Sequence, residues 1–137
     1  MLPSVPILPV LAAAAAVFVV GALWYSPLVL GRQWVAAHGY TEEKIREMRA
    51  SAGRAYLVSF VCYVVMAAAV SVLVMRIGVT SLKGGLKLGL FLGVGFAATL
   101  GLTANMFSEK KLSTWMIDAG YQIVYMMVMG AILAVWR

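Results

Sequence analysis

Four long apolar runs constrain this chain more than any other feature of its sequence. They cover residues 5–25, 55–75, 88–107 and 112–136, and Asp118 is the one charged residue inside them. Each run reaches the roughly 20 residues that a helix needs to cross the ~30 Å hydrocarbon core of a bilayer. With 64% hydrophobic and only 12% charged residues, the chain also lacks the charged surface typical of a soluble domain.

We therefore predict an all-α protein with four transmembrane helices in an up-down bundle, forming a single domain over residues 1–137. The spans are expected at about 5–25, 55–76, 86–107 and 113–136, with a cytoplasmic loop at 27–54. The first run is expected to be a span and not a cleaved signal peptide, because no Lys or Arg precedes it.

The stretch GALWYSPLVLGRQW, residues 21–34, ends the first run. Trp24 and Tyr25 are predicted to lie at the membrane interface, where amphipathic rings are enriched. Ser26 is expected to cap a short interfacial helix that begins at Pro27 and ends near residue 37. Thr41 is expected to cap a second, charged helix that leads toward the second span.

The basic residues give a prediction of orientation. The loops after the first and third runs carry Arg32, Lys44, Arg46, Arg49, Arg54, Lys110 and Lys111, against Arg76, Lys83, Lys87 and Arg137 on the other side. Seven against four favours a cytoplasmic location for the first set, with both termini outside. The net charge of +6 does not predict nucleic-acid binding, because the basic residues lie at the ends of apolar runs.

Small residues recur every four positions through the third run. Residues four apart share one face of a helix, and small side chains let two membrane helices approach closely. This ladder predicts a helix-packing seam, formed either within the chain or between copies, although glycine is also common in membrane helices. Its members are Gly85, Gly89, Gly93, Ala97 and Gly101.

The polar residues of the spans are expected to gather toward the cytoplasmic leaflet. Asp118 lies six residues after Leu112, or about 9 Å along a helix, which places it near the headgroup boundary. One hypothesis is a polar pocket open to the cytoplasm; the alternative is that Asp118 pairs with Arg54, Arg32 or Lys110 and joins helices. The candidate pocket residues are Asp118, Gln122, Tyr121, Asn105, Arg54, Trp24 and Tyr25.

Catalytic and metal-binding motifs are not recognisable in the sequence. No HExxH, P-loop or GxSxG motif is present, and His38 stands alone in a loop. Cys62 and several methionines could offer sulfur to copper(I), but methionine is an ordinary packing residue. We therefore predict no enzyme activity, no metal and no cofactor.

Two segments carry a resemblance to a known family. GALWYSPLVLGRQWVAAHG, followed by a charged helix, and IDAGYQIVYMMVMGAILAVW near the end resemble the bacterial membrane family catalogued as domain of unknown function 1761. The resemblance runs from about Gly21 to Trp136 and implies four hydrophobic segments in the bacterial inner membrane. It implies no activity. Relatives often carry histidine at the position of Gln122, which keeps hydrogen bonding but does not titrate.

Three functions are compatible with these observations. The first, and the one that we predict, is a homo-oligomer or an accessory subunit of a larger membrane complex, which meets its partners and the membrane lipids within the bilayer. The second is a small-solute or ion transporter or channel built around Asp118, for which the apolar opposite leaflet is an obstacle. The third, a lipid-modifying enzyme using Arg32 or Arg54 to bind a headgroup, lacks a visible nucleophile.

Overall fold

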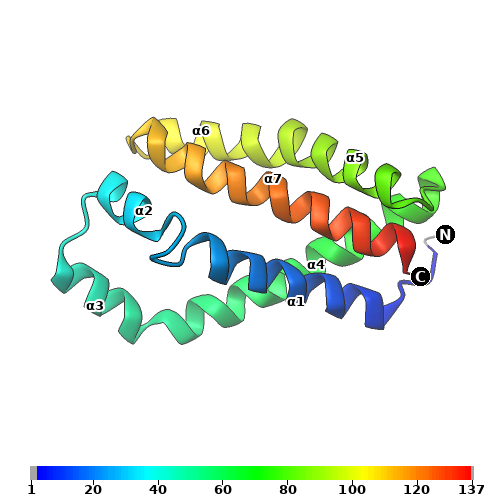
Figure 1. The fold of residues 1–137 in the computed structure, drawn as a ribbon, viewed down its shortest axis with the longest axis horizontal. Helices are drawn as coiled ribbons and strands as arrows, with labels where there is room; N and C mark the ends of the chain where they lie inside the picture. Colours follow the sequence, from blue (N-terminus) through cyan, green and yellow to red (C-terminus); the bar gives the residue numbers. More distant parts are fainter. Residues whose placement is uncertain (1–2, 137) are drawn as a thin grey trace.

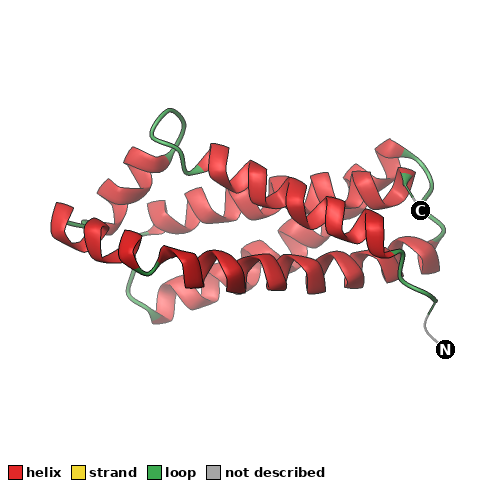
Figure 2. Ribbon diagram, turned by 90° about the horizontal axis from the view of Figure 1, so that it is seen from below, coloured by secondary structure: helices red, strands yellow, loops and turns green. Residues whose placement is uncertain are grey.

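The computed structural model describes residues 3–136, and the described chain is helical without a strand. The all-α class is confirmed, and four of the helical segments are long and apolar enough to cross a membrane. Loops are confined to the two ends of the molecule (Figure 2). The elements are α1 (Ile7–Trp24), α2 (Gly31–His38), α3 (Glu42–Ala50), α4 (Ala52–Ile77), α5 (Leu82–Leu92), η1 (Gly93–Ala98), α6 (Thr99–Phe107) and α7 (Leu112–Val135).

The long helices lie side by side, and α5, η1 and α6 form one continuous span, Leu82–Phe107 (Figure 1). The start of α1, the end of α7 and the α4–α5 turn lie at one end of the bundle. The short helices α2 and α3 and the α6–α7 turn lie at the other end. The third span begins earlier than predicted, at Leu82, because the Ser81 hydroxyl accepts a hydrogen bond from Gly84 N at 3.0 Å.

The turn after α1 differs from the prediction. The short helix begins at Gly31 and not at Pro27, and Ser26 is not its cap, because the Ser26 hydroxyl donates back to Leu23 O at 2.8 Å. Residues 25–30 form a tight turn that is closed by Gly31 N donating to Ser26 O at 2.9 Å. A Cβ at Gly31 would lie 2.4 Å from Tyr25 O, so glycine is what allows this close approach.

The other predicted helix ends have mixed outcomes. Thr41 caps α3 as expected, accepting from Lys44 N at 3.2 Å, and Gly39 ends α2 with a left-handed backbone at φ 69°. Helix α7 begins after Lys111, and neither Ser113 nor Thr114 caps it. The Thr114 hydroxyl instead donates to Lys111 O at 2.7 Å, because Thr114 already lies in the first turn of the helix.

The core lies along α7, the most buried of the four long helices. Buried side chains of α7 pack against α1 and α4, with Val17, Val74, Met129 and Leu133 almost fully enclosed. Large apolar side chains on the outer faces stay exposed, such as Leu57 and Val65 of α4. Apolar side chains on both the inner and the outer faces are expected where hydrocarbon, and not water, surrounds a bundle.

The small-residue ladder faces α7 over its first half. A Cβ at Gly85 would lie 2.4 Å from Gly130 O, and one at Gly89 would lie 2.2 Å from Met126 O. These two glycines therefore let the backbones of α5 and α7 touch. Gly93 is also close, because its Cβ would lie 2.9 Å from Ile123 Cα.

The ladder loses its spacing of four at the π-helical segment η1. A π-helical turn takes one extra residue, so the buried face continues at Ala98, while Ala97 is only half-buried. At the end of η1, Trp115 of α7 donates a hydrogen bond from Nε1 to Ala98 O at 2.9 Å. Beyond it, Gly101 keeps only ordinary contact with α7, with Trp115 Cδ1 3.5 Å from its would-be Cβ.

Candidate functional site

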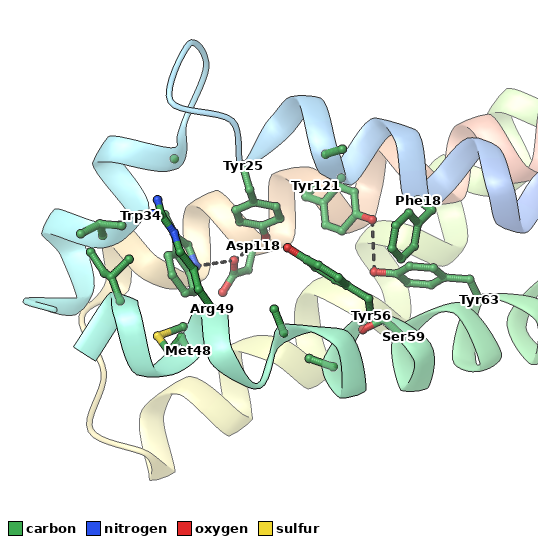
Figure 3. Close-up of a pocket in the computed structure, with 17 residues that line it drawn as sticks. Phe18, Tyr25, Trp34, Met48, Arg49, Tyr56, Ser59, Tyr63, Asp118 and Tyr121 are labelled. Atoms are coloured by element: carbon green, nitrogen blue, oxygen red, sulfur yellow. Dashed lines mark hydrogen bonds between the residues drawn. The ribbon is translucent and has the colours of Figure 1, made fainter. Parts of the chain in front are cut away.

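A pocket of about 750 Å³ lies between α1 and α2 on one side and α3 and α4 on the other, at the end of the bundle that carries α2 and α3 (Figure 3). Its volume falls within the roughly 300–1,000 Å³ of small-molecule sites. Helix α7 contributes Asp118 and Tyr121 to its inner wall. Much of the remaining lining is aromatic: Phe18, Tyr25, Trp34, Tyr56 and Tyr63.

Asp118 is the one acidic side chain among the described residues that line this pocket. Its Oδ1 accepts two hydrogen bonds, from the Tyr25 hydroxyl at 2.5 Å and from Trp34 Nε1 at 3.1 Å. The tight turn at residues 25–30 makes this possible, because it folds α2 back so that Tyr25 and Trp34 meet edge to face, with ring centroids 6.0 Å apart. The turn and α2 are thereby joined to α7 through one carboxylate.

Tyrosines close the inner end of the pocket. The Tyr121 hydroxyl donates to Val17 O at 3.0 Å and lies 3.2 Å from the Tyr63 hydroxyl. The rings of Tyr121 and Tyr125 pack edge to face with centroids 4.8 Å apart. Beyond these rings lie the buried apolar side chains of the core. The pocket is therefore closed toward the middle of the bundle.

The structure brings three of the seven predicted pocket residues together. Asp118, Tyr121 and Tyr25 all line the pocket. Trp24 lies just outside and anchors α1 to α7, donating from Nε1 to Ile117 O at 3.0 Å. Arg54 is exposed and does not line the pocket, where Arg49 is the basic residue.

Gln122 and Asn105 lie on another side of α7. Tyr121 and Gln122 are consecutive, so their side chains point about 100° apart around the helix. Tyr121 faces the pocket, while Gln122 Oε1 lies near Gly101 of α6. Asn105 is buried at the α6–α7 turn, where its Nδ2 donates to Lys111 O and to the Thr114 hydroxyl at 3.1 and 3.0 Å. Its Oδ1 has no partner in the described part of the chain.

The alternative expectation for Asp118, an ion pair, is not what the structure has. Its hydrogen-bond donors are the neutral groups of Tyr25 and Trp34, and within residues 3–136 no basic side chain forms an ion pair with it. Nor do the described residues contain a group of three His, Cys, Asp or Glu side chains that could hold a metal ion.

Sequence reasoning missed the residues that the long loop and α4 bring to the pocket. Trp34 belongs to the predicted interfacial helix but was not among the predicted pocket residues, and the turn directs it onto Asp118. Tyr56 and Ser59 lie on one face of α4, and Arg49 lies near the end of α3. An available signal was the aromatic content of the loop, where Trp34, His38 and Tyr40 form a ring cluster.

Comparison with known proteins places the chain in a family. A family model described as protein of unknown function DUF1761 matches residues 8–134, nearly the whole chain. The chain therefore belongs to a class of proteins with four membrane-span-like helices, and within that class to the DUF1761 family. No curated protein and no solved structure gives a significant match.

Proposed function

We propose that this protein is a membrane carrier that binds a small solute in the pocket around Asp118. The observation that carries the proposal is a half-buried carboxylate at the inner wall of a pocket of about 750 Å³ that ends at the buried tyrosines in the middle of the bundle. An ionisable group within a membrane span is costly and usually marks a solute or ion pathway. A site closed on one side is expected of a carrier, which exposes its site alternately, and not of a channel.

The proposal includes an orientation. The basic residues of the α2–α3 end, with those of the α6–α7 turn, favour this end as the cytoplasmic one. The four spans then cross a bacterial inner membrane up and down, with both termini outside and α2 at the interface. The pocket would accordingly receive its solute from the cytoplasmic leaflet or release it there.

A first experiment tests whether water and solutes reach the pocket. In a Cys62→Ser background, Ser59→Cys places a thiol in the pocket wall, and Val58→Cys places one at the same depth on the outer face of α4, where Val58 is 55% exposed. A charged, water-soluble thiol reagent should modify residue 59 much faster than residue 58. Equal rates for the two positions would contradict an aqueous pocket.

A second experiment tests transport. Proteoliposomes loaded with a mixture of small metabolites are analysed by mass spectrometry for solutes that leave faster than from protein-free liposomes. The matched control is Ser59→Phe, which fills the pocket from a lining position. Loss of one solute class through the wild type but not the variant supports a carrier. A pocket that is labelled from water but passes no solute would overturn it.

The homo-oligomeric or accessory role predicted from the glycine ladder remains the second candidate. Gly85 and Gly89 contact α7 of the same chain, so a partner would have to bind the exposed apolar faces instead. Measuring the mass of the complex purified with its native lipids tests this role. A larger complex that contains other proteins would favour it over the carrier.

A further inference from the structure

The second carboxylate oxygen of Asp118 indicates what kind of solute the pocket takes. Both hydrogen bonds to Asp118 end on Oδ1, and Oδ2 has no hydrogen bond from the described residues. Because both donors are neutral, they orient the carboxylate without compensating its charge. A ligand that completes the site must therefore bring a positive charge or a hydrogen-bond donor to Oδ2.

The walls indicate which kind of cation is favoured. Aromatic rings attract ammonium groups electrostatically, and the attraction is stronger where water is excluded. Tyr25, Trp34 and Tyr56 lie around the carboxylate, and Phe18 lies farther along the pocket, beside Tyr63 (Figure 3). A hydrated metal ion prefers several oxygen ligands, and the described pocket residues offer only one carboxylate.

The rest of the lining suits an apolar body. Ala52, Ala55, Ile45 and Met48 form the side of the pocket made by α3 and α4. Arg49 is the basic residue of the lining and is exposed to solvent. At the inner wall, the Asp118 carboxylate attracts a cation and repels an anion.

We propose that the pocket binds a substituted ammonium group carrying an apolar body, with the ammonium beside Asp118 Oδ2 and the body against α3 and α4. This proposal rests on the proposed function, because it names the solute class of the same pocket. Two sources share this chemistry: a free amphiphilic amine or quaternary ammonium compound, and the headgroup of an ammonium-bearing phospholipid.

The test compares a cation with its neutral isostere. Benzyltrimethylammonium and neopentylbenzene have nearly the same shape and differ by one positive charge. Binding to the purified full-length protein, in nanodiscs of phosphatidylglycerol alone, is followed by calorimetry and by tryptophan fluorescence, since Trp34 lines the site. We expect the cation to bind at least about tenfold more tightly than the isostere, as a desolvated cation beside rings and a carboxylate should.

Two variants separate recognition from folding. Asp118→Asn keeps an oxygen that can accept from Tyr25 and Trp34 but removes the charge, so the preference for the cation should disappear while the isostere binds as before. Tyr56→Leu removes a ring that is 60% exposed, and it should weaken cation binding by about two- to fivefold. Thermal unfolding of each variant verifies that the bundle is intact.

Each outcome decides the question. If the isostere binds as tightly as the cation, the ammonium assignment is wrong while the pocket and the proposed function remain. If neither probe binds although residue 59 is labelled from water, the ammonium assignment is wrong as well, and the liposome experiment alone decides the proposed function. Adding phosphatidylethanolamine or phosphatidylcholine to the nanodiscs identifies the source: displacement of the cation by these lipids indicates a headgroup site, and unchanged affinity indicates a free solute.

Discussion

The α5–α7 interface and the pocket between α1–α2 and α3–α4 share helix α7 but are built in opposite ways. In the first, glycine brings backbones together until no side chain fits between them, as at Gly89 and Met126 O. In the second, aromatic side chains hold the helices apart around a pocket of about 750 Å³. The α5–α7 interface is therefore a close contact between backbones, whereas the pocket is a space lined by aromatic side chains.

The difference shows how a small membrane bundle can combine cohesion with an opening. Water does not drive helices together in lipid, so close packing must supply the cohesion, and a seam of glycines does so over a short length. The pocket side then depends on a few directed bonds, such as those of Tyr25 and Trp34 to Asp118. Regions with few packed contacts are expected to open first.

The largest loss of stability is expected from a substitution of Gly89 in the α5–α7 interface. Gly89→Ala places a Cβ 2.2 Å from Met126 O and 2.5 Å from Met127 Cα, and backbone atoms cannot move aside cheaply. We expect a loss of about 3 kcal/mol in the free energy of unfolding, the upper part of the overpacking range. Circular dichroism during titration with a denaturing detergent measures it.

Gly95→Ala is the matched control, because no atom lies within 4 Å of its would-be Cβ. This variant should be unchanged or more stable, by up to about 1 kcal/mol, since alanine favours helix over glycine. Equal losses at residues 89 and 95 would mean that the seam is not closely packed.

The turn at Gly31 is expected to give the next largest effect. Gly31→Ala brings a Cβ to 2.4 Å from Tyr25 O and should cost about 2 kcal/mol, within the overpacking range, while displacing Trp34 from Asp118. Tryptophan emission and unfolding measure both effects. Gly53→Ala, where a Cβ meets nothing within 4 Å, should show neither change. If the tryptophan emission of the Gly31→Ala variant is unchanged, the turn does not control the position of Trp34 in the pocket.

A smaller effect is expected where the two regions meet, at the tyrosines. Tyr121→Phe removes the hydroxyl that donates to Val17 O and contacts the Tyr63 hydroxyl. Interhelical hydrogen bonds in membrane proteins average about 0.6 kcal/mol, so a loss of this size is expected. Tyr63→Phe keeps the bond to Val17 O and should cost less. If Tyr121→Phe lowers the free energy of unfolding as much as Gly89→Ala does, the tyrosine hydrogen bonds stabilise the bundle as strongly as the glycine contacts.

The smallest effect on stability should come from the pocket wall. Tyr56 is 60% exposed, and Tyr56→Leu should change the free energy of unfolding by less than about 0.5 kcal/mol, as surface substitutions do. The same denaturant titration measures it. A loss of several kcal/mol would show that the pocket is part of the packed core and not an opening.

Much of the fold was predictable, because run length and charge placement are linear properties of the chain. The four span-length helices, the cap at Thr41 and the helix end at Gly39 follow from local residues. The start of α2 was not predictable from Ser26 and Pro27. It depends on how closely Gly31 approaches Tyr25 O, a contact that no capping pattern describes.

For the candidate site, the sequence indicated the carboxylate but not its neighbours. Asp118 was conspicuous as the one charge in an apolar run, and Tyr25 and Tyr121 followed from their depth in the membrane. Gln122 and Asn105 lie at similar depth but face α6 and the α6–α7 turn. Depth along a helix can be counted from the sequence, whereas its rotation toward a partner cannot.

By itself, the sequence determined that this chain has four helices suited to a membrane, because apolar runs of this length can cross the hydrocarbon as helices, which satisfy their own backbone hydrogen bonds. The tertiary structure alone decided that the ladder faces α7, and that the π-helical segment moves its buried face from Ala97 to Ala98. It also decided that Trp34 reaches Asp118 across 84 residues of sequence. Such contacts depend on helix rotation and on turn geometry, which are set when all the helices pack together.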